Sequence, residues 1–583
     1  MTLALAAALA ACTEQVSSPQ APARYADAIV VGAGLSGLSA AVEMGRDGGV
    51  NVVLLDMNSV MGGHAVMAGG FAIVDTPIQH AEGFADSPEK AYADWMEWTE
   101  DGDADWTRYY AEHSREMIYD WMADMGVDFV RIQAGHENSV PRFHFTPNGA
   151  LDVVLALFRE ALALPTVAFE WNEKVHSLVV EDGRVTGVNT RNLRTGIERT
   201  LMAPHVVLAT GGFEGNLERV LDYWRTDLPK PDRLLLGASI HATGTGHDLA
   251  AEAGAGLTWM NRHYIYTNGM VDPRDPQATL AITAGNSAAL WVNAQGRRFT
   301  NEAGFDKAIL ADVLDQEPTT YWAIFDETSR GTFSMRGREW ITNPTEGHTV
   351  LDHPEATVTA ESLEQLASLT GLPLESLLAS VERFNGLIDA GVDEDFGRFS
   401  HADDAPPKIA QPPFYAIQFF PMPRKSMGGV AVDMQARALN GSGDVVPGLY
   451  AAGELTGSVG INGTHGMDGM FLGPALVTGR IAGRTIAEAV LEGASREPVT
   501  ARPSPDSLPD SASWEPSLTA DDLEALLSVE RDGYWHFRIS HELALERGYE
   551  CVLCHSPQVP FAALDNRESL LAQSQVCGNC HGR

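Results

Sequence analysis

The fold of this chain is decided by the stretch Gly32-Ala33-Gly34-Leu35-Ser36-Gly37. An apolar strand is predicted before it, over residues 26–31, and a helix from within it, over residues 35–46. A second strand over residues 50–55 completes a βαβ unit, and Asp56 follows at the place of a ribose-binding carboxylate. The first glycine allows a tight turn, the second lets a pyrophosphate approach the backbone, and the third lets the helix pack closely. The pattern predicts a dinucleotide-binding unit rather than a glycine-rich turn without a ligand.

The composition is that of a globular protein with an acidic surface. A chain of 583 residues, 44% of them hydrophobic and 20% charged, predicts two or three domains. Asp and Glu number 78 against 40 Lys and Arg, for a formal net charge of -38. This balance argues against nucleic acid as a partner, because it does not neutralise phosphates. It favours a basic partner such as a small cytochrome, or it only keeps an exported protein soluble.

Further glycine-rich motifs occur along the chain, two of them at the ends of short apolar strands predicted over residues 206–209 and 448–451. They read Met61-Gly62-Gly63-His64, Ala209-Thr210-Gly211-Gly212, Thr243-Gly244-Thr245-Gly246-His247-Asp248, Tyr450-Ala451-Ala452-Gly453-Glu454 and Gly473-Pro474-Ala475-Leu476. Together they resemble the FAD-binding fold of the fumarate reductase and succinate dehydrogenase flavoprotein superfamily, over about residues 25–490. The resemblance implies that Glu454 binds the ribityl chain and that a helix beginning near Gly473 faces the flavin.

FAD is therefore the expected cofactor, bound without a covalent link. Some relatives attach FAD through a histidine in the loop that holds His64, but the spacing from His64 to Gly69 is one residue shorter here. The residues expected to bind FAD are Gly32, Gly34, Gly37, Asp56, Gly62, Gly63, His64, Gly69, Gly70, Thr210, Gly211, Gly212, Gly453, Glu454, Gly473, Pro474, Ala475 and Leu476.

Two motifs of the region 256–423 resemble the capping domain of periplasmic flavocytochrome c fumarate reductases and urocanate reductases. They are Phe299-Thr300-Asn301-Glu302 and Phe325-Asp326-Glu327-Thr328-Ser329-Arg330. The resemblance implies that Arg330 protonates one carbon of a polarised C=C bond while flavin delivers hydride to the other, and that Glu302 relays protons to Arg330. Because a free guanidinium hardly deprotonates, the relay is a necessary part of this assignment. The alternative is a surface arginine and an Asn-Glu helix cap.

Three departures from that family bear on the substrate. The segment 303–307 lacks the second relay arginine, the segment 424–426 reads Arg-Lys-Ser where the family has a histidine, and the segment 462–470 lacks the carboxylate-clamping arginine. A dicarboxylate needs two cationic partners, because an unpaired buried carboxylate is costly. We therefore expect a monocarboxylate or other enoyl substrate rather than fumarate. The candidate specificity contacts, each of which could instead be packing, are Arg424, Lys425, Tyr264, Tyr266, His263 and His465.

The C-terminal region carries two c-type haem motifs, Cys551-Val552-Leu553-Cys554-His555 and Cys577-Gly578-Asn579-Cys580-His581. Zinc ribbons share the paired cysteines, but a histidine directly after each pair is what haem attachment requires. Thioether bonds are predicted to Cys551, Cys554, Cys577 and Cys580, and the proximal iron ligands are His555 and His581. His536 and His541 are the candidate sixth ligands, unless one of them lies on the surface and one iron is five-coordinate.

The N-terminus predicts export. A short apolar run from Leu3 ends in Leu9-Ala10-Ala11-Cys12, which resembles a lipoprotein signal with Cys12 as the acylated residue. An ordinary signal peptide with an incidental cysteine is the alternative. Either version takes the chain to the periplasm, where c-type haem is attached, and the first version anchors it to a membrane.

The predicted fold class is α/β, a Rossmann-type FAD-binding domain with an inserted α+β capping domain and a small, mainly α dihaem cytochrome c domain. The boundaries are 1–23 signal and tether, 24–255 and 424–495 FAD-binding domain, 256–423 capping domain, 496–517 Pro/Ser linker and 518–583 dihaem domain. Four of the 12 tryptophans fall in the region 91–125 and are predicted to be core.

The predicted function is a reductase in which electrons from a periplasmic or membrane quinol-linked donor pass through the haems to FAD. Hydride then goes to a small unsaturated substrate, an enoate of the urocanate or acrylate kind. The alternative is an FAD-dependent dehydrogenase similar to ketosteroid dehydrogenases, which desaturates its substrate and exports electrons through the haems.

Overall fold

The structure is a computed structural model that describes residues 24–46, 49–58, 60–193, 196–273, 275–335 and 350–492. Cys12, the Pro/Ser linker, both haem motifs and the candidate ligands His536 and His541 lie outside the described residues. Among the described helices, none is long and apolar enough to cross a membrane.

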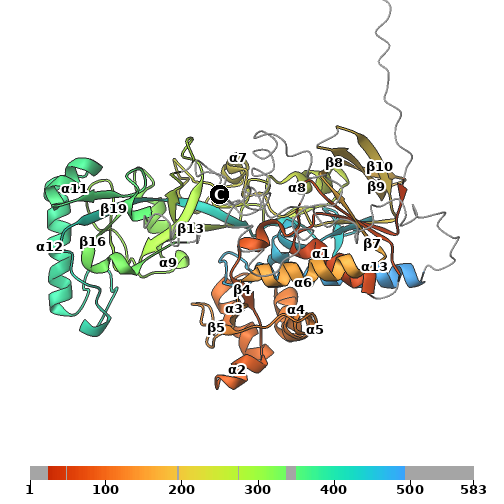
Figure 1. The fold of residues 1–583 in the computed structure, drawn as a ribbon, viewed down its shortest axis with the longest axis horizontal. Coiled ribbons are helices and arrows are strands. Elements are labelled where there is room, and N and C mark those ends of the chain that lie inside the picture. The colour runs from red at the N-terminus through yellow and green to blue at the C-terminus, as the bar shows by residue number, and fades with distance from the viewer. Residues whose placement is uncertain are drawn as a thin grey trace, which may run out of the picture.

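A six-stranded sheet forms the centre of the nucleotide-binding part (Figure 1), in the order β21-β22-β11-β2-β3-β7. All neighbouring pairs are parallel except the edge pair β21–β22. The strands are β2 (Ala28–Val31), β3 (Val52–Asp56), β7 (Val167–Trp171), β11 (His205–Leu208), β21 (Arg437–Leu439) and β22 (Val445–Ala451). The four residues of β2 are buried, as expected for the central strand of a parallel sheet covered on both faces.

Helix α1 (Leu35–Arg46) begins and ends where the sequence predicts, and the predicted strands lie within a few residues of β2, β3, β11 and β22. α1 packs against α6 (Ala150–Ala163) and α13 (Leu472–Glu492), so the chain's two distant nucleotide-binding segments share one core. Smaller sheets flank this core. They consist of β1 (Arg24–Tyr25), β8 (Glu173–Glu181), β9 (Arg184–Asn192) and β10 (Glu198–Met202), of β4 (Gly70–Ala72), β5 (Arg131–Gln133) and β6 (Phe143–Phe145), and of β12 (Leu257–Thr258) with β20 (Gly429–Val430).

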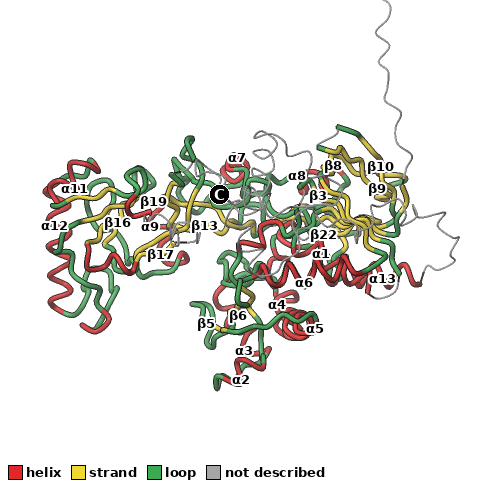
Figure 2. Tube along the Cα trace, viewed as in Figure 1, coloured by secondary structure: helices red, strands yellow, loops and turns green. Residues whose placement is uncertain are grey.

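A second body lies at the other end of the molecule, built on a seven-stranded sheet (Figure 2). Its strands are β13 (His263–Val271), β14 (Ala281–Asn286), β15 (Leu290–Val292), β16 (Tyr321–Asp326), β17 (Phe333–Met335), β18 (Val358–Ala360) and β19 (Phe414–Ser426). Its helices are α9 (Asp306–Leu314), α11 (Leu363–Thr370) and α12 (Leu374–Ala390). The pairing of β13 with β19 is antiparallel and carries this sheet towards the nucleotide-binding part, and β19 runs past the predicted boundary at 423.

A helical segment projects below the nucleotide-binding part in Figure 1. It contains α2 (Pro77–Ala81), α3 (Pro88–Thr99), α4 (Ala104–Ser114), η2 (Arg115–Asp120) and α5 (Trp121–Asp124). Trp95, Trp106 and Trp121 are buried, as the sequence predicts. Trp98 is only partly buried, and its indole nitrogen donates to the carbonyl of Gly466 at 3.2 Å.

Candidate functional site

The loop after β2 has two positions, Gly32 and Gly37, without room for a Cβ. Gly32 has a φ of 109°, and a Cβ there would collide with the carbonyl oxygen of Ala209. A Cβ on Gly37 would collide with the carbonyl oxygen of Gly32, so α1 can approach the loop only through a glycine. A Cβ on Gly34, in contrast, would meet nothing within 4 Å, which leaves open space beside the start of α1. This is the geometry that a pyrophosphate at a helix N-terminus needs.

A second glycine loop lies beside the first. Gly62 pairs with Gly34 in an isolated β-bridge, and its amide donates to the carbonyl of Ala33 at 2.7 Å. Asp56 lies at the same site. Its carboxylate accepts hydrogen bonds from the backbone amides of Ala33 at 2.8 Å and of Asn58 at 2.7 Å. Burial raises the pKa of Asp56 to about 6. A carboxylate in this position can accept hydrogen bonds from hydroxyl groups of a ligand, and such bonds would offset the desolvation cost of its charged form.

The motifs around Gly212 and Glu454 meet in a second cluster. Glu454 Oε1 accepts the amide of Ser426 at 3.0 Å, and a Cβ on Gly212 would collide with Glu454 Oε1 and Ser426 Oγ. Thr210 Oγ1 is buried and has no hydrogen-bond partner among the described residues. An unpartnered hydroxyl here and open space at Gly34 show that these residues fit a bound dinucleotide such as FAD.

The remaining predicted FAD contacts lie at the edges of these clusters. Gly473, Pro474, Ala475 and Leu476 are in the first turn of α13, as the sequence motif implies. The amides of Gly473 and Ala475 already donate to the carbonyls of Gly469 and Phe471. His64 Nδ1 lies 3.2 Å from Lys425 Nζ.

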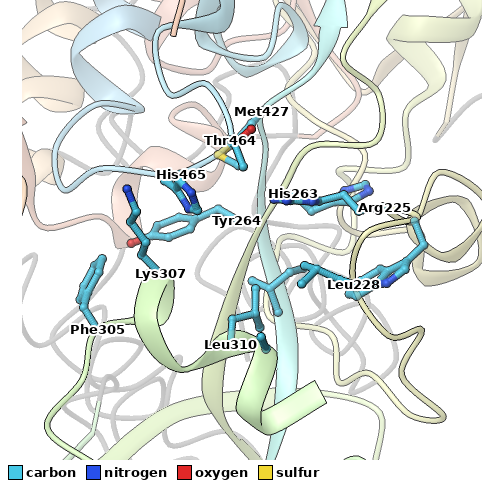
Figure 3. A pocket seen from close by; sticks show the side chains of 14 residues that line it. Arg225, Leu228, His263, Tyr264, Phe305, Lys307, Leu310, Met427, Thr464 and His465 are labelled. Atoms are coloured by element: carbon cyan, nitrogen blue, oxygen red, sulfur yellow. The ribbon is translucent and has the colours of Figure 1, made fainter. Parts of the chain in front are cut away.

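A pocket of about 90 Å³, partly open to solvent, lies between the two bodies (Figure 3). It joins the segment 224–228 after α7 (Leu217–Asp222), strand β13, the start of α9 and the glycine-rich loop 464–466. Its lining is Trp224, Arg225, Leu228, His263, Tyr264, Ile265, Phe305, Lys307, Leu310, Ala311, Met427, Thr464, His465 and Gly466. Met427 directly follows Ser426, so the pocket adjoins the Glu454 cluster. The many apolar and aromatic walls with a few polar groups are typical of a small-molecule site.

Both cations of the pocket already have acidic partners. Lys307 Nζ lies 2.9 Å from Glu100 Oε1 and donates to the carbonyl of Trp98 at 2.7 Å. Arg225 Nε donates to Asp227 Oδ1 at 2.9 Å. Burial and the nearby Lys307 lower the pKa of His465, whose Nε2 lies 3.5 Å from Glu100 Oε1.

The structure places three of the predicted specificity residues in the pocket, His263, Tyr264 and His465. Adjacent on β13, His263 and Tyr264 point to opposite sides in Figure 3. Tyr266 packs edge-on against Tyr264, with ring centroids 5.0 Å apart, behind the lining.

The two predicted cationic contacts are directed elsewhere. Arg424 donates to the carbonyl of Gly237 and lies over the ring of Tyr266, whereas Lys425 contacts His64. Neither is part of the lining.

Arg330 and Glu302 also lie outside the pocket lining. Arg330 Nη2 pairs with Asp352 Oδ1 at 2.9 Å, and 35% of its side chain is exposed. Glu302 is 1% exposed and binds Arg298 at 2.7 Å and Arg398 at 3.2 Å. Asp393 completes this buried network at 2.7 Å from Arg298, which holds the pKa of Asp393 down at about 2 against the effect of burial.

Three functional candidates were missed by the sequence motifs. Arg225 and Lys307 supply the pocket cations, and Glu214, which is not part of the lining, binds His263. Lys307 stands in the segment that lacks the family's relay arginine, and Glu214 follows the Gly211-Gly212 motif by two residues. These two positions, next to recognised motifs, are the features of the sequence from which Lys307 and Glu214 could have been found.

The comparisons agree with this geometry. The FAD binding domain family matches residues 27–472. A cytochrome fumarate reductase of Shewanella frigidimarina is 31% identical over 480 residues, which cover 81% of this chain and 79% of that protein. A KsdD-like steroid dehydrogenase of Mycobacterium tuberculosis is 29% identical, over 82% of this chain and 99% of that protein. The open conformation of a flavocytochrome c3 fumarate reductase superimposes with a TM-score of 0.67 and 29% identity, over 81% of this chain and 79% of that one. The chain therefore belongs to the FAD binding domain family and is an FAD-dependent oxidoreductase that acts on carbon–carbon bonds.

Proposed function

We propose that this protein is a periplasmic, lipid-anchored flavocytochrome c that reduces the activated C=C bond of an enoate other than fumarate. Electrons would come from a quinol-linked donor and pass through the haems at Cys551–Cys554 and Cys577–Cys580. Bound FAD would then supply the hydride. The chain's own pocket residues bind the substrate, exclude water and supply the proton.

The charge balance of the pocket is the observation that carries the choice of substrate. Fumarate would bring two carboxylates, but Lys307 and Arg225 are each already neutralised by an acidic partner. The second carboxylate would therefore be buried without a counter-charge, which is costly. One carboxylate can still share Lys307, because Glu100 holds it through a single contact, whereas Asp227 occupies both Nε and Nη2 of Arg225. A monocarboxylate with a planar apolar body fits these walls, with Trp224, Tyr264 and Phe305 as aromatic contacts.

The haem assignment rests on the two CxxCH motifs and on the likeness to a cytochrome fumarate reductase. The periplasmic location rests on the same haem motifs together with the Cys12 signal.

The second candidate is the reverse reaction, desaturation of a substrate of steroid-like shape with export of electrons through the haems. The apolar lining favours it, and so does the steroid dehydrogenase relative, which is matched over 99% of its length.

A direct test gives the full-length protein reduced viologen and a panel of enoates that includes fumarate, urocanate and acrylate. The proposal predicts dye oxidation with monocarboxylates and little with fumarate. The parallel assay offers saturated acids and 3-ketosteroids with an acceptor dye. If turnover occurs only in that second assay, the protein is a dehydrogenase and the proposal of a reductase is wrong. Replacing Cys551 and Cys554 by Ala should remove one haem per chain from the absorption spectrum.

A further inference from the structure

A buried carboxylate–imidazole pair forms one wall of the pocket. Glu214 is fully buried, and its Oε1 lies 2.9 Å from Nδ1 of His263, which lines the pocket. The other carboxylate oxygen, Oε2, is buried without a hydrogen-bond partner among the described residues. The pair therefore joins the segment after Gly211-Gly212 to the first residue of β13.

The ring of His263 is held on three sides. Its Nε2 lies 3.4 Å from the carbonyl oxygen of Tyr223. The ring of Trp224 is nearly parallel to it, at 13° and 6.1 Å between centroids, and Phe213 contacts it edge-on at 5.6 Å. Rings fixed in this way lose little entropy when they act on a bound molecule.

The neighbours of the ring determine where its protons lie. A carbonyl oxygen can only accept, so the 3.4 Å contact with Tyr223 favours the form of His263 that carries a proton on Nε2. The contact with Glu214 requires a second proton between Nδ1 and Oε1. Burial raises the pKa of Glu214, and the charge of His263 counters part of that effect, so the second proton is readily shared. The pair therefore holds two protons, of which the one on Nε2 has only a long, weak partner.

The other imidazole and the two cations of the lining are less suited to give up a proton. Lys307 and Arg225 are strongly basic and ion-paired, and His465 faces the exposed Glu100. Arg330 is outside the lining.

We propose that His263 exchanges a proton with the substrate in this pocket and that Glu214 is its positioning residue. The assignment rests on the proposed function. In reduction, bound FAD would supply the hydride that forms a C–H bond at one carbon as the π bond breaks. The electron pair left at the other carbon takes the proton of Nε2, while the shared proton moves fully to Nδ1. The pair is left as carboxylate and neutral imidazole, and water returns the proton. In desaturation the same ring accepts the proton.

Other charges act on this pair from the surrounding elements. They are Glu454 near Glu214, His247 across the ring of Phe213, Tyr223 and Arg225 next to Trp224, and Lys425 on the neighbouring strand β19. Variants at these positions are avoided in the test, because they would change the pH profile by themselves.

The test compares full-length, FAD-loaded and haem-loaded wild type with His263→Gln, Glu214→Gln and Glu214→Asp. We expect His263→Gln to lower kcat by ~10²–10⁴-fold with little change in KM or in the FAD and haem spectra. Added imidazole should restore part of the rate. Glu214→Gln should shift the alkaline limb of the kcat profile to lower pH, because an amide stabilises a protonated ring less than a carboxylate does. Glu214→Asp should leave the alkaline limb of the kcat profile at the same pH as in the wild type.

The matched control is His80→Gln, which removes an exposed histidine whose Nε2 lies 2.7 Å from Asp75. It should leave rate and profile unchanged. A kcat for His263→Gln within twofold of wild type, with Arg330→Ala inactive, would overturn the proposal and return the proton transfer to Arg330.

A spectroscopic measurement makes the pair testable apart from turnover. Histidine-selective ¹⁵N NMR of the holoprotein at pH 7 should show protons on both ring nitrogens of His263, with the Nδ1 proton lost or shifted in Glu214→Gln. A bare Nε2 would overturn the proposal even if the enzyme is active. If wild type converts none of the substrates, the proposed function fails, whereas the NMR result still decides the protonation of the pair.

Discussion

Replacing Asp56 by Asn should remove a pH-dependent cost from the FAD-free protein. Burial raises the pKa of Asp56 from its ordinary 3.8 to about 6. Because the folded pKa is the higher one, the group's contribution to stability is complete below about pH 4 and is lost as pH rises through about 6. At 1.36 kcal/mol per pH unit, the difference between 3.8 and about 6 is worth ~3 kcal/mol at neutral pH.

The hydrogen bonds of Asp56 add a constant that does not depend on pH. The two carboxylate oxygens accept the amides of Ala33 and Asn58, and an Asn side chain has only one acceptor oxygen for them. Losing one of these bonds costs about 1–3 kcal/mol at every pH. The change with pH of the difference between wild type and Asp56→Asn therefore isolates the carboxyl group.

The assay is urea unfolding of deflavinated wild type and Asp56→Asn at pH 4.5, 6 and 7.5. Between pH 4.5 and 7.5 the wild type should lose ~2 kcal/mol relative to the variant, since the cost is already partly present at pH 4.5. Asp403→Asn, which changes an exposed aspartate, is the control and should show no such trend. In the same preparations FAD should bind Asp56→Asn about 10–100-fold more weakly, because a charged acceptor for a ribose hydroxyl is lost. A difference that stays constant within about 0.5 kcal/mol over this range would refute the burial argument.

Three further substitutions separate structural from functional roles. Gly37→Ala should abolish FAD binding, measured as flavin per chain, because its Cβ would collide with the carbonyl oxygen of Gly32. The matched control is Gly386→Ala in α12, where a Cβ meets nothing within 4 Å, and it should raise the unfolding free energy by ~0.5–1 kcal/mol. Glu302→Gln should lower the unfolding free energy by about 3–5 kcal/mol, because it leaves Arg298 and Arg398 buried with too little negative charge. Calorimetry measures that loss, and a Glu302→Gln protein with wild-type stability but no turnover would instead support a relay role.

The nucleotide-binding unit was predictable from sequence because its rules are local. The spacing of Gly32, Gly34 and Gly37 depends on backbone geometry within a single turn, and α1 begins and ends at the predicted residues. The alternation of strand and helix likewise predicts a parallel sheet, and the pairs β2–β3 and β11–β2 are parallel. Asp56 could be placed because it directly ends β3.

The pocket depended on tertiary structure. The sequence could not predict which cation lines the pocket. Arg424 and Lys425 are consecutive on β19, and the directions of their side chains depend on the neighbours Tyr266 and His64. Motif position likewise says nothing about burial, so it could not show that Glu302 lies in a buried ion network with Arg298 and Arg398.

The pair of Glu214 and His263 is the clearest case. The two residues are 49 positions apart in the chain, and neither belongs to a motif with a known partner. Their contact exists because β13 pairs with β19 at Ser426, whose hydroxyl in turn accepts the amide of Phe213. The sequence alone therefore determined where the nucleotide binds, since that depends on local backbone geometry. The tertiary structure decided which side chains face the substrate, since long-range strand pairing brings them together.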